Sequence, residues 1–367
     1  MRTIKKTLPQ LETTYFPDEF PSINEVAFID IETTGFTARL SQLYLIGCIV
    51  YENDNFVLYQ WFLDSKDDEP EVLNDFAKFI TPYKMLVHFN GNQFDIPYLN
   101  DKFEQNNIDF SLSEYKGLDL YRRIAPYKNF LKLPDCKQKT IETYLGIIRE
   151  DLFTGKELID IYHDYTANHD EETLKFLLLH NEEDIMGMVQ ILKILSYVDL
   201  LNKHITVTKV QANTYNDIDG NTKQELIMKL KLSTNLPIHL SNHANGCVFS
   251  GINDTATLKV PIVREELKYF YSNYKDYYYL PTEDVALHKS VAAFVDSAHR
   301  KQATAATCYT RKISEYLPQW DFIVEPFFKR EYRAKEYFFE VTEQIKQDRA
   351  LFSAYASHIL KMIFEST

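Results

Sequence analysis

The chain has 367 residues, of which 45% are hydrophobic and 25% are charged. This length predicts two domains, and this composition excludes a disordered or collagen-like chain. The net charge of −13 argues against a polyanionic partner for the chain as a whole. The charge is unevenly distributed, however. Residues 1–199 hold 19 Lys/Arg and 34 Asp/Glu, whereas residues 200–367 hold 21 Lys/Arg and 19 Asp/Glu.

The first half of the chain alternates strand-like and helix-like patterns after an N-terminal extension, residues 1–23. Short apolar runs predict strands, and apolar positions three and four residues apart predict helices. In chain order we expect strands at 26–31, 43–51 and 56–63, a helix at 71–80, a strand at 85–89, and helices at 94–103 and 171–195. Three strands followed by strand–helix alternation predict an α/β fold, a mixed sheet flanked by helices, over residues 24–199.

The second half, residues 200–367, has the pattern of a smaller α+β domain. Alternating apolar and polar residues predict antiparallel strands, at 205–215, 224–232, 248–249 and 257–263. Residues 281–284 resemble a helix start with Thr282 as the cap, and residues 336–364 have the pattern of a terminal helix. We therefore predict an accessory domain in which strands precede helices.

The sequence has no features of a membrane or secretory protein. No apolar run reaches the roughly 18 residues of a membrane span, and no apolar segment of signal-peptide length follows the first basic residues. The four cysteines lie far apart, as is typical of proteins in reducing compartments. We expect a cytoplasmic protein with no membrane partner.

The first candidate motif lies at the end of the strand predicted at 26–31. Alternate side chains of a strand share a face, so Asp30 and Glu32 point together while Ile29 and Ile31 point into the core. Two carboxylates on a buried strand are costly unless a cation neutralises them. The alternative interpretation is a strand that frays into an acidic loop.

Two further acidic motifs follow along the chain. Asp95 comes after the strand predicted at 85–89, where a turn into a helix can bind a ligand, although an Asp there is also a common helix cap. His180 and Asp184 are four residues apart in a helical stretch, so they lie on one face with roughly 5–6 Å between their Cβ atoms. A solvated acidic face with an incidental histidine is the alternative here.

The order and context of these motifs resemble the DEDD (DnaQ-like) 3′–5′ exonuclease superfamily, whose fold is ribonuclease-H-like. That superfamily has Asp-x-Glu on a first strand, an Asp after a later strand, and a final Asp on a helix with an aromatic or imidazole partner. The resemblance covers residues 24–198, including 117–121 and 139–147, and the YprB-like branch of predicted exonucleases fits it best. The common classes have Tyr four residues or His five residues before the last Asp, whereas this chain has His four residues before it.

The resemblance implies phosphodiester hydrolysis from the 3′ end of DNA or RNA with two Mg²⁺ or Mn²⁺ ions. Hard cations prefer oxygen ligands, and two ions about 3.5–4 Å apart can clamp the attacking and leaving oxygens. The implied metal ligands are the four carboxylates of Asp30, Glu32, Asp95 and Asp184.

The resemblance also implies roles for residues around these carboxylates. His180 would be the general base, since imidazole titrates near neutral pH. The implied contacts to the terminal nucleotide are Thr33, Thr34, Gly35 and Asn90. The alternative from another class is a non-catalytic nucleic-acid-binding or adaptor protein on an inherited nuclease fold.

The second half offers two further candidate sites. The basic, hydroxyl-rich stretch 299–335 suits a phosphate backbone, and we expect it to face the metal site and clamp nucleic acid. The residues expected to carry this clamp are Arg300, Lys301, Arg311 and Lys312, and a solvated basic face is the alternative. His239, His243 and Cys247 could be zinc ligands, but a structural zinc site needs four ligands and no fourth is evident. Ordinary surface or turn histidines are therefore the better interpretation.

Overall fold

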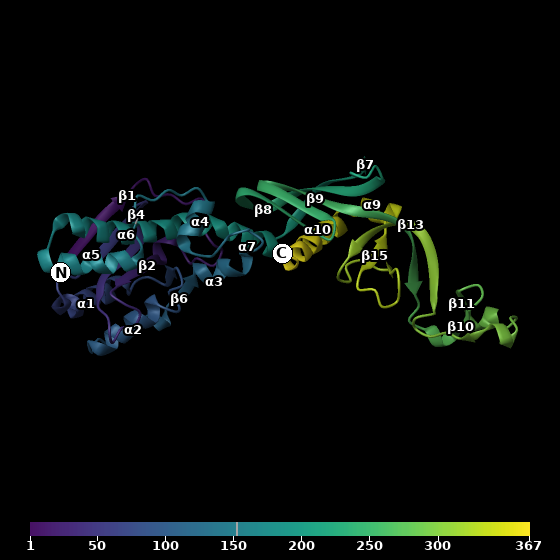
Figure 1. The fold of residues 1–367 in the computed structure, drawn as a ribbon, viewed down its shortest axis with the longest axis horizontal. Helices are drawn as coiled ribbons and strands as arrows, with labels where there is room; N and C mark the ends of the chain where they lie inside the picture. The colour runs from purple at the N-terminus through teal and green to yellow at the C-terminus, as the bar shows by residue number, and fades with distance from the viewer. Residues whose placement is uncertain (152) are drawn as a thin grey trace. The chain divides into compact units, whose positions relative to one another are not determined.

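The structure is a computed structural model that describes residues 1–151 and 153–367. The chain forms two compact units, Met1–Val198 and Asp199–Thr367. The first is coloured purple to teal and the second green to yellow in Figure 1. None of the described helices combines the length and the apolar character needed to cross a membrane.

The first unit is built on a six-stranded mixed sheet of order β1-β4-β3-β2-β5-β6. β2 lies in its interior, antiparallel to β3 and parallel to β5, which is parallel to β6. The strands are β1 (Arg2–Leu8), β2 (Val26–Thr33), β3 (Leu43–Glu52), β4 (Asn55–Phe62), β5 (Met85–His88) and β6 (Lys116–Asp119). The carboxyl ends of the three parallel strands therefore meet at one edge of the sheet, where ligands commonly bind in α/β folds.

Helices cover both faces of this sheet (Figure 1). One face packs against α1 (Glu69–Ile80) and α2 (Asp95–Gln105) in a buried cluster that includes Ile29, Phe76 and Leu99. The opposite face packs against α5 (Gly155–Asn168) and α6 (Glu171–Ile191) around Tyr44 and Tyr162. The shorter helices are α3 (Leu120–Ile124), α4 (Gln138–Tyr144), α7 (Ser196–Asn202) and the 3-10 turns Ile23–Glu25, Lys66–Asp68, Leu112–Glu114, Ala125–Tyr127 and Leu192–Leu195.

The predicted mixed sheet flanked by helices is confirmed, and each predicted element of this half lies close to an observed one. The N-terminal residues differ from the expectation of an extension, because Arg2–Leu8 form β1 and pair with β4 at the edge of the sheet. The basic side chains of β1 contact acidic residues: Arg2 pairs with Asp64 at 2.8 Å and Lys5 with Glu52 at 3.3 Å. Charge complementarity with this acidic unit thus accompanies the pairing of the strand.

The second unit has a separate, fully antiparallel six-stranded sheet of order β14-β15-β13-β9-β8-β7. Helix α10 (Arg349–Glu365) packs on β7, β8 and β9. The strands are β7 (Ile205–Asn216), β8 (Thr222–Ala244), β9 (Cys247–Phe270), β13 (Tyr309–Gln319), β14 (Phe327–Phe328) and β15 (Tyr337–Glu340). A small sheet contains β10 (Tyr277–Leu280), β11 (Val285–His288) and β12 (Lys301–Gln302), beside α8 (Lys289–Ala292), α9 (Glu343–Gln347) and the 3-10 turns Tyr274–Asp276 and Ser297–His299.

Three predictions for this unit need correction, although the strands-then-helix character is present. The two short strands expected at 248–249 and 257–263 are parts of one long strand, β9, which pairs with β8 and β13. The helix expected from 281 is a turn between β10 and β11, where Asp284 has φ +50° and accepts the hydroxyl protons of Tyr279 and Tyr309. The terminal helix is shorter than expected, because residues 337–340 pair with β13 as β15.

Candidate active site

β2 presents two carboxylates on one side of the first sheet. Ile29 and Ile31 point to the core cluster beneath α1 and α2. Asp30 and Glu32 alternate with them along β2, so both carboxylates face α6. Asn181 of α6 donates to Asp30 at 3.0 Å and accepts from the buried Gln60 at 3.1 Å. The period-2 geometry of a strand thus places both acids against one helix.

The turn after β5 brings Asp95 to the same place. Asp95 is the first residue of α2, is 4% exposed, and accepts the backbone N–H of Ile31 at 3.3 Å. The turn before it is held by Asp119 at the end of β6, which accepts the backbone N–H groups of Asn90 at 3.0 Å and Asn92 at 3.3 Å. Asn90 has φ +62°, a left-handed conformation that Asn tolerates better than most residues. Asp95 therefore reaches the site because two neighbouring strand ends fix its turn.

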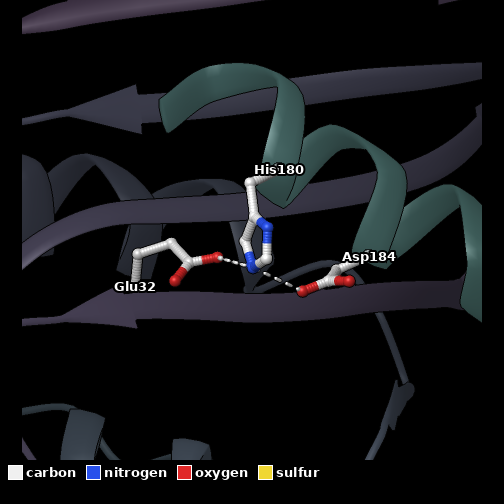
Figure 2. Close-up of side chains that lie close together, drawn as sticks. All are labelled: Glu32, His180 and Asp184. Atoms are coloured by element: carbon white, nitrogen blue, oxygen red, sulfur yellow. Dashed lines mark ion pairs between the residues drawn. The ribbon is translucent and has the colours of Figure 1, made fainter. Parts of the chain in front are cut away.

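α6 supplies the last two predicted residues. The Nε2 atom of His180 lies 3.2 Å from Asp184 and 3.8 Å from Glu32, so the imidazole stands between the two carboxylates (Figure 2). Ligand atoms of these three residues all lie within 4.8 Å of one another. The structure thus brings Asp30, Glu32, Asp95, His180 and Asp184 together from β2, α2 and α6.

The carboxylates of this cluster repel one another in a site with little solvent. Burial raises the pKa of Asp30 well above its ordinary range, and Glu32, Asp95 and Asp184 raise it further. Burial is also the main cause that raises the pKa of Glu32 to about 8 and the pKa of Asp95 to about 7. These shifts show that ionising Asp30, Glu32 and Asp95 is unfavourable in this buried site.

Asp184 and His180 behave differently because each faces an opposite charge. Burial favours a higher pKa for Asp184, but His180 and Arg149 outweigh it and leave the pKa lowered. Burial likewise favours a lower pKa for His180, but Asp184, Glu32 and Asp151 outweigh it and raise the pKa to about 9. The imidazole therefore carries its proton readily in the absence of other cations.

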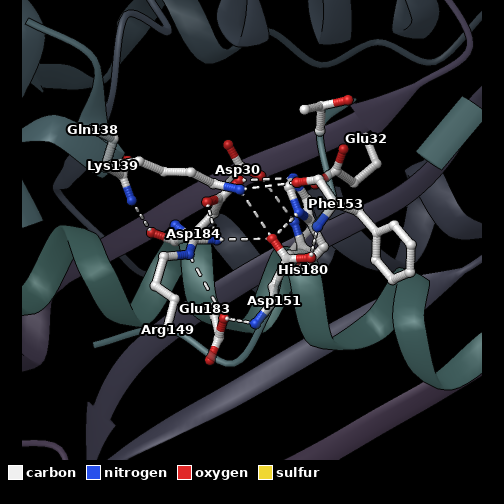
Figure 3. A network of polar contacts seen from close by, with 12 residues as sticks. Asp30, Glu32, Gln138, Lys139, Arg149, Asp151, Phe153, His180, Glu183 and Asp184 are labelled. Atoms are coloured by element: carbon white, nitrogen blue, oxygen red, sulfur yellow. Dashed lines mark hydrogen bonds and ion pairs between the residues drawn. The ribbon is translucent and has the colours of Figure 1, made fainter. Parts of the chain in front are cut away.

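Asp151 is a site residue that the sequence analysis missed. Its Oδ2 lies 2.7 Å from Nδ1 of His180, and its side chain is 1% exposed. Lys139 donates to the same oxygen at 3.1 Å, and the backbone N–H of Phe153 donates to the other oxygen at 3.0 Å (Figure 3). An acceptor fixed on Nδ1 directs Nε2 toward Glu32 and Asp184, as in other oriented histidines.

Arg149 is the second residue that was missed. Its guanidinium lies 2.6 Å from Asp184, 3.2 Å from Glu142 and 3.6 Å from Asp151 (Figure 3). Gln138 of α4 donates to the buried Glu142 at 2.8 Å and to the backbone carbonyl of Asp184 at 2.7 Å. Arg149 therefore supplies the positive charge that offsets part of the carboxylate cluster.

The donor set of this cluster suits a hard divalent cation. Four carboxylates offer oxygen ligands, and the raised pKa values of three of them, Asp30, Glu32 and Asp95, indicate that added positive charge would be favourable. No thiolate lies in the group of possible ligand atoms, which is Glu32, His180 and Asp184. Among the residues that the structure describes, no comparable group forms at the three candidate zinc ligands, where His239 bonds Ser250 at 2.9 Å and Cys247 is buried.

Three of the residues expected to contact a terminal nucleotide lie at the end of β2 and directly after it: Thr33, Thr34 and Gly35. Thr33 donates its hydroxyl to the carbonyl of Gly35 at 2.8 Å, and the hydroxyl of Thr34 accepts the N–H of Gln42 at 2.9 Å. Asn90 lies on the neighbouring turn, beside Asp119. The loop is thus closed on itself and follows directly after the strand that carries Asp30 and Glu32.

The basic stretch expected to clamp nucleic acid has partners within the second unit. Arg311 pairs with Asp284 and lies 3.6 Å from Glu266, and Lys312 pairs with Glu340 at 2.7 Å. Arg300 donates to the carbonyl of Ala292 and stacks 4.8 Å from the ring centre of Tyr278, whereas Lys301 is exposed on β12. Arg311 and Lys312 are therefore partly neutralised by acids of β9, of β15 and of the turn before β11.

Comparison with known proteins bears on the first unit. Residues 27–196 match the family model of the RNase_H superfamily. This match, together with the mixed sheet and its flanking helices, confirms the predicted ribonuclease-H-like fold. No curated protein matches the chain.

Solved structures that resemble part of the chain include two DNA enzymes. The family B DNA polymerase from the hyperthermophilic archaeon Pyrobaculum calidifontis is 16% identical, with a TM-score of 0.40 over 50% of this chain and 26% of the polymerase. E. coli Exonuclease I in complex with a dT13 oligonucleotide is 13% identical, with a TM-score of 0.32 over 56% of this chain and 54% of the exonuclease. The chain thus spans about a quarter of the polymerase and about half of the exonuclease.

Proposed function

We propose that the first unit is a metal-dependent 3′–5′ exonuclease of the DEDD type that hydrolyses phosphodiester bonds in DNA or RNA. The observation that carries this proposal is the convergence of Asp30, Glu32, Asp95 and Asp184 around one site, with His180 between two of them. The match of residues 27–196 to the RNase_H superfamily supports nucleic acid as the substrate class.

The four carboxylates are the proposed ligands of two Mg²⁺ or Mn²⁺ ions. When bound, such ions supply Lewis-acid activation of water and neutralise charge on the phosphate and on the leaving oxygen. The carboxylates would then stay deprotonated, because added positive charge lowers the pKa values of Glu32 and Asp95, which burial and the neighbouring acids raise. Without a cation the ionised carboxylates destabilise the folded protein, and a bound divalent cation would balance their charge.

His180 is the proposed general base. Its Nε2 atom faces Glu32 and Asp184. These acids raise the pKa of the imidazole, so it could take a proton from a water that attacks the phosphorus only when bound cations offset their charge. The water oxygen forms the new bond to phosphorus and the bond to the 3′ oxygen breaks. The 3′ oxygen of the shortened strand takes up a proton from solvent, and a terminal nucleoside monophosphate leaves. Asp151 accepts from Nδ1 and keeps the ring in the tautomer that leaves Nε2 free to accept.

The second unit is proposed as an accessory domain, and the loop of Thr33, Thr34 and Gly35 as the contact for the terminal nucleotide. Incubation of 5′-labelled DNA and RNA strands with Mg²⁺ or Mn²⁺ tests the activity. We expect a ladder of products that shortens from the 3′ end and is absent in EDTA. Binding of both strands without any metal-dependent product would favour the adaptor alternative instead.

A further inference from the structure

A groove opens beside α4, outside the carboxylate cluster. It has a volume of about 440 Å³, within the roughly 300–1,000 Å³ typical of ligand sites. Its walls combine two lysines with apolar and hydroxyl side chains, which include Lys132, Leu133, Pro134, Lys139, Thr143 and Tyr144. A cation beside apolar walls is the combination that binds a phosphate and a base together.

The segment that forms this groove is basic in an otherwise acidic region. Residues 122–139 contain six Lys/Arg and one Asp, although residues 1–199 contain 34 Asp/Glu against 19 Lys/Arg. Lys132, Lys137 and Lys139 are exposed. This local reversal of charge is complementary to a polyanion.

α4 connects the groove to the carboxylate cluster. Gln138 and Glu142 lie on the helix face that contacts Asp184 and Arg149. The adjacent face lines the groove, and Lys139 contributes to both because its Nζ atom donates to Asp151 at 3.1 Å. Asp151 in turn holds His180 at 2.7 Å. One wall of the groove is therefore linked to the proposed general base through Asp151, by two ion pairs in series (Figure 3).

We propose that this groove binds a single strand of nucleic acid next to the nucleotide being removed. Lys132 and Lys139 of the groove, together with the exposed Lys137 at the start of α4, would contact backbone phosphates. The Pro134 and Tyr144 walls would contact an unpaired base. Apolar walls favour a single strand, since the faces of paired bases are stacked inside a duplex. This inference rests on the proposed function, because it takes the carboxylate cluster as the place where the strand ends.

Binding and its salt dependence test the groove without turnover. Fluorescence anisotropy of a labelled oligothymidylate in EDTA compares the parent with the double variant Lys132→Gln, Lys137→Gln. Each phosphate contact contributes about 0.7 to the slope of log K against log salt for a single strand. We expect the double variant to lower the slope by about 1.4 and to weaken binding about 25-fold at about 0.1 M salt.

A matched control separates the groove from general charge. Lys66→Gln with Lys78→Gln removes two exposed lysines of the same unit, one in a 3-10 turn and one in α1, away from the groove. This control is expected to keep the parent's affinity and slope. Equal losses in both double variants would overturn the proposal, as would competition by poly-L-glutamate as effective as that by unlabelled oligonucleotide.

Turnover separates this inference from the proposed function. With Mn²⁺, the ratio of kcat/KM for the oligonucleotide to that for the p-nitrophenyl ester of thymidine 5′-monophosphate should fall about 25-fold in the groove variant and stay unchanged in the control. An unchanged ratio in the groove variant would overturn the groove alone. If the parent hydrolyses neither substrate, the proposed function fails, while the anisotropy measurement still decides whether the groove binds a strand.

Discussion

The cost of the carboxylate cluster can be measured by neutralising Glu32. Burial and the neighbouring acids raise its pKa from 4.5 to about 8 in the folded protein. The folded state therefore holds the proton of Glu32 more tightly than the unfolded state, so the parent loses stability as pH rises from about 4.5 to about 8. Glu32→Gln has no such proton and escapes this loss.

The size of the effect follows from the pKa shift. One pKa unit corresponds to about 1.4 kcal/mol, so ionising Glu32 costs the folded state about 3 kcal/mol more at pH 8.5 than at pH 5.5. The stabilising effect of Glu32→Gln should therefore grow by about 3 kcal/mol between these two pH values. Millimolar Mg²⁺ should stabilise the parent much more than the variant, because the variant has lost a proposed ligand.

Urea unfolding in EDTA at both pH values measures this growth. Trp61 is 3% exposed in β4 of the first unit, so a Trp320→Phe background restricts the fluorescence signal to that unit. Glu12→Gln, at an exposed position, is the control and should show no pH-dependent gain. A Glu32→Gln variant no more stable than the parent at pH 8.5 would refute the reasoning that burial and mutual repulsion of the acids prepare this site for a cation.

Three further predictions concern the same site. Asp184→Asn should abolish metal-dependent cleavage and leave the near-ultraviolet circular dichroism unchanged, because it keeps the size and removes the charge of a proposed ligand. Asp151→Asn should lower kcat at least about tenfold with little change in KM, since a neutral amide holds Nδ1 of His180 less firmly; steady-state kinetics measure this split. Gly47→Ala should destabilise the first unit by about 1–3 kcal/mol and lower kcat, because its Cβ would come within 2.0 Å of Asn181 Oδ1 and displace α6; urea unfolding and the cleavage assay measure both effects.

Much of the candidate site could be predicted because its residues follow local rules. The period-2 geometry of β2 puts Asp30 and Glu32 on one face, and the i,i+4 spacing puts His180 beside Asp184. Asp95 follows a parallel strand, whose carboxyl end must lie at the same edge of the sheet. The first two placements depend only on residues near one another in the chain, and the third also needs the parallel pairing of β2 with β5.

Arg149 and Asp151 escaped prediction because nothing local marks them. Asp151 reaches His180 across 29 residues, and Arg149 reaches Asp184 from the same segment between α4 and α5. Their neighbours in sequence show neither strand nor helix periodicity around the charges. An acid and a base in such a segment look like ordinary solvated residues until the fold brings α6 against them.

The second unit was harder to predict because long-range strand pairing decides its structure. Residues 337–340 are a short apolar run, which periodicity alone cannot assign to a strand or a helix, and pairing with β13 makes them β15. From the sequence we expect Lys312 to bind a phosphate, whereas in the structure Glu340 of β15 pairs with it at 2.7 Å. Neither contact can be seen without knowing the sheet order.

The central claim, that the four carboxylates form a divalent-metal site, is tested most directly by a crystal structure with bound Mn²⁺. Anomalous scattering at a wavelength sensitive to manganese locates the ions without assumptions about ligands. We predict anomalous peaks among the carboxylates of Asp30, Glu32, Asp95 and Asp184, and no peak there in an Asp184→Asn crystal soaked in the same way. A parent crystal with no peak at the cluster, or with manganese bound only elsewhere, would contradict the account.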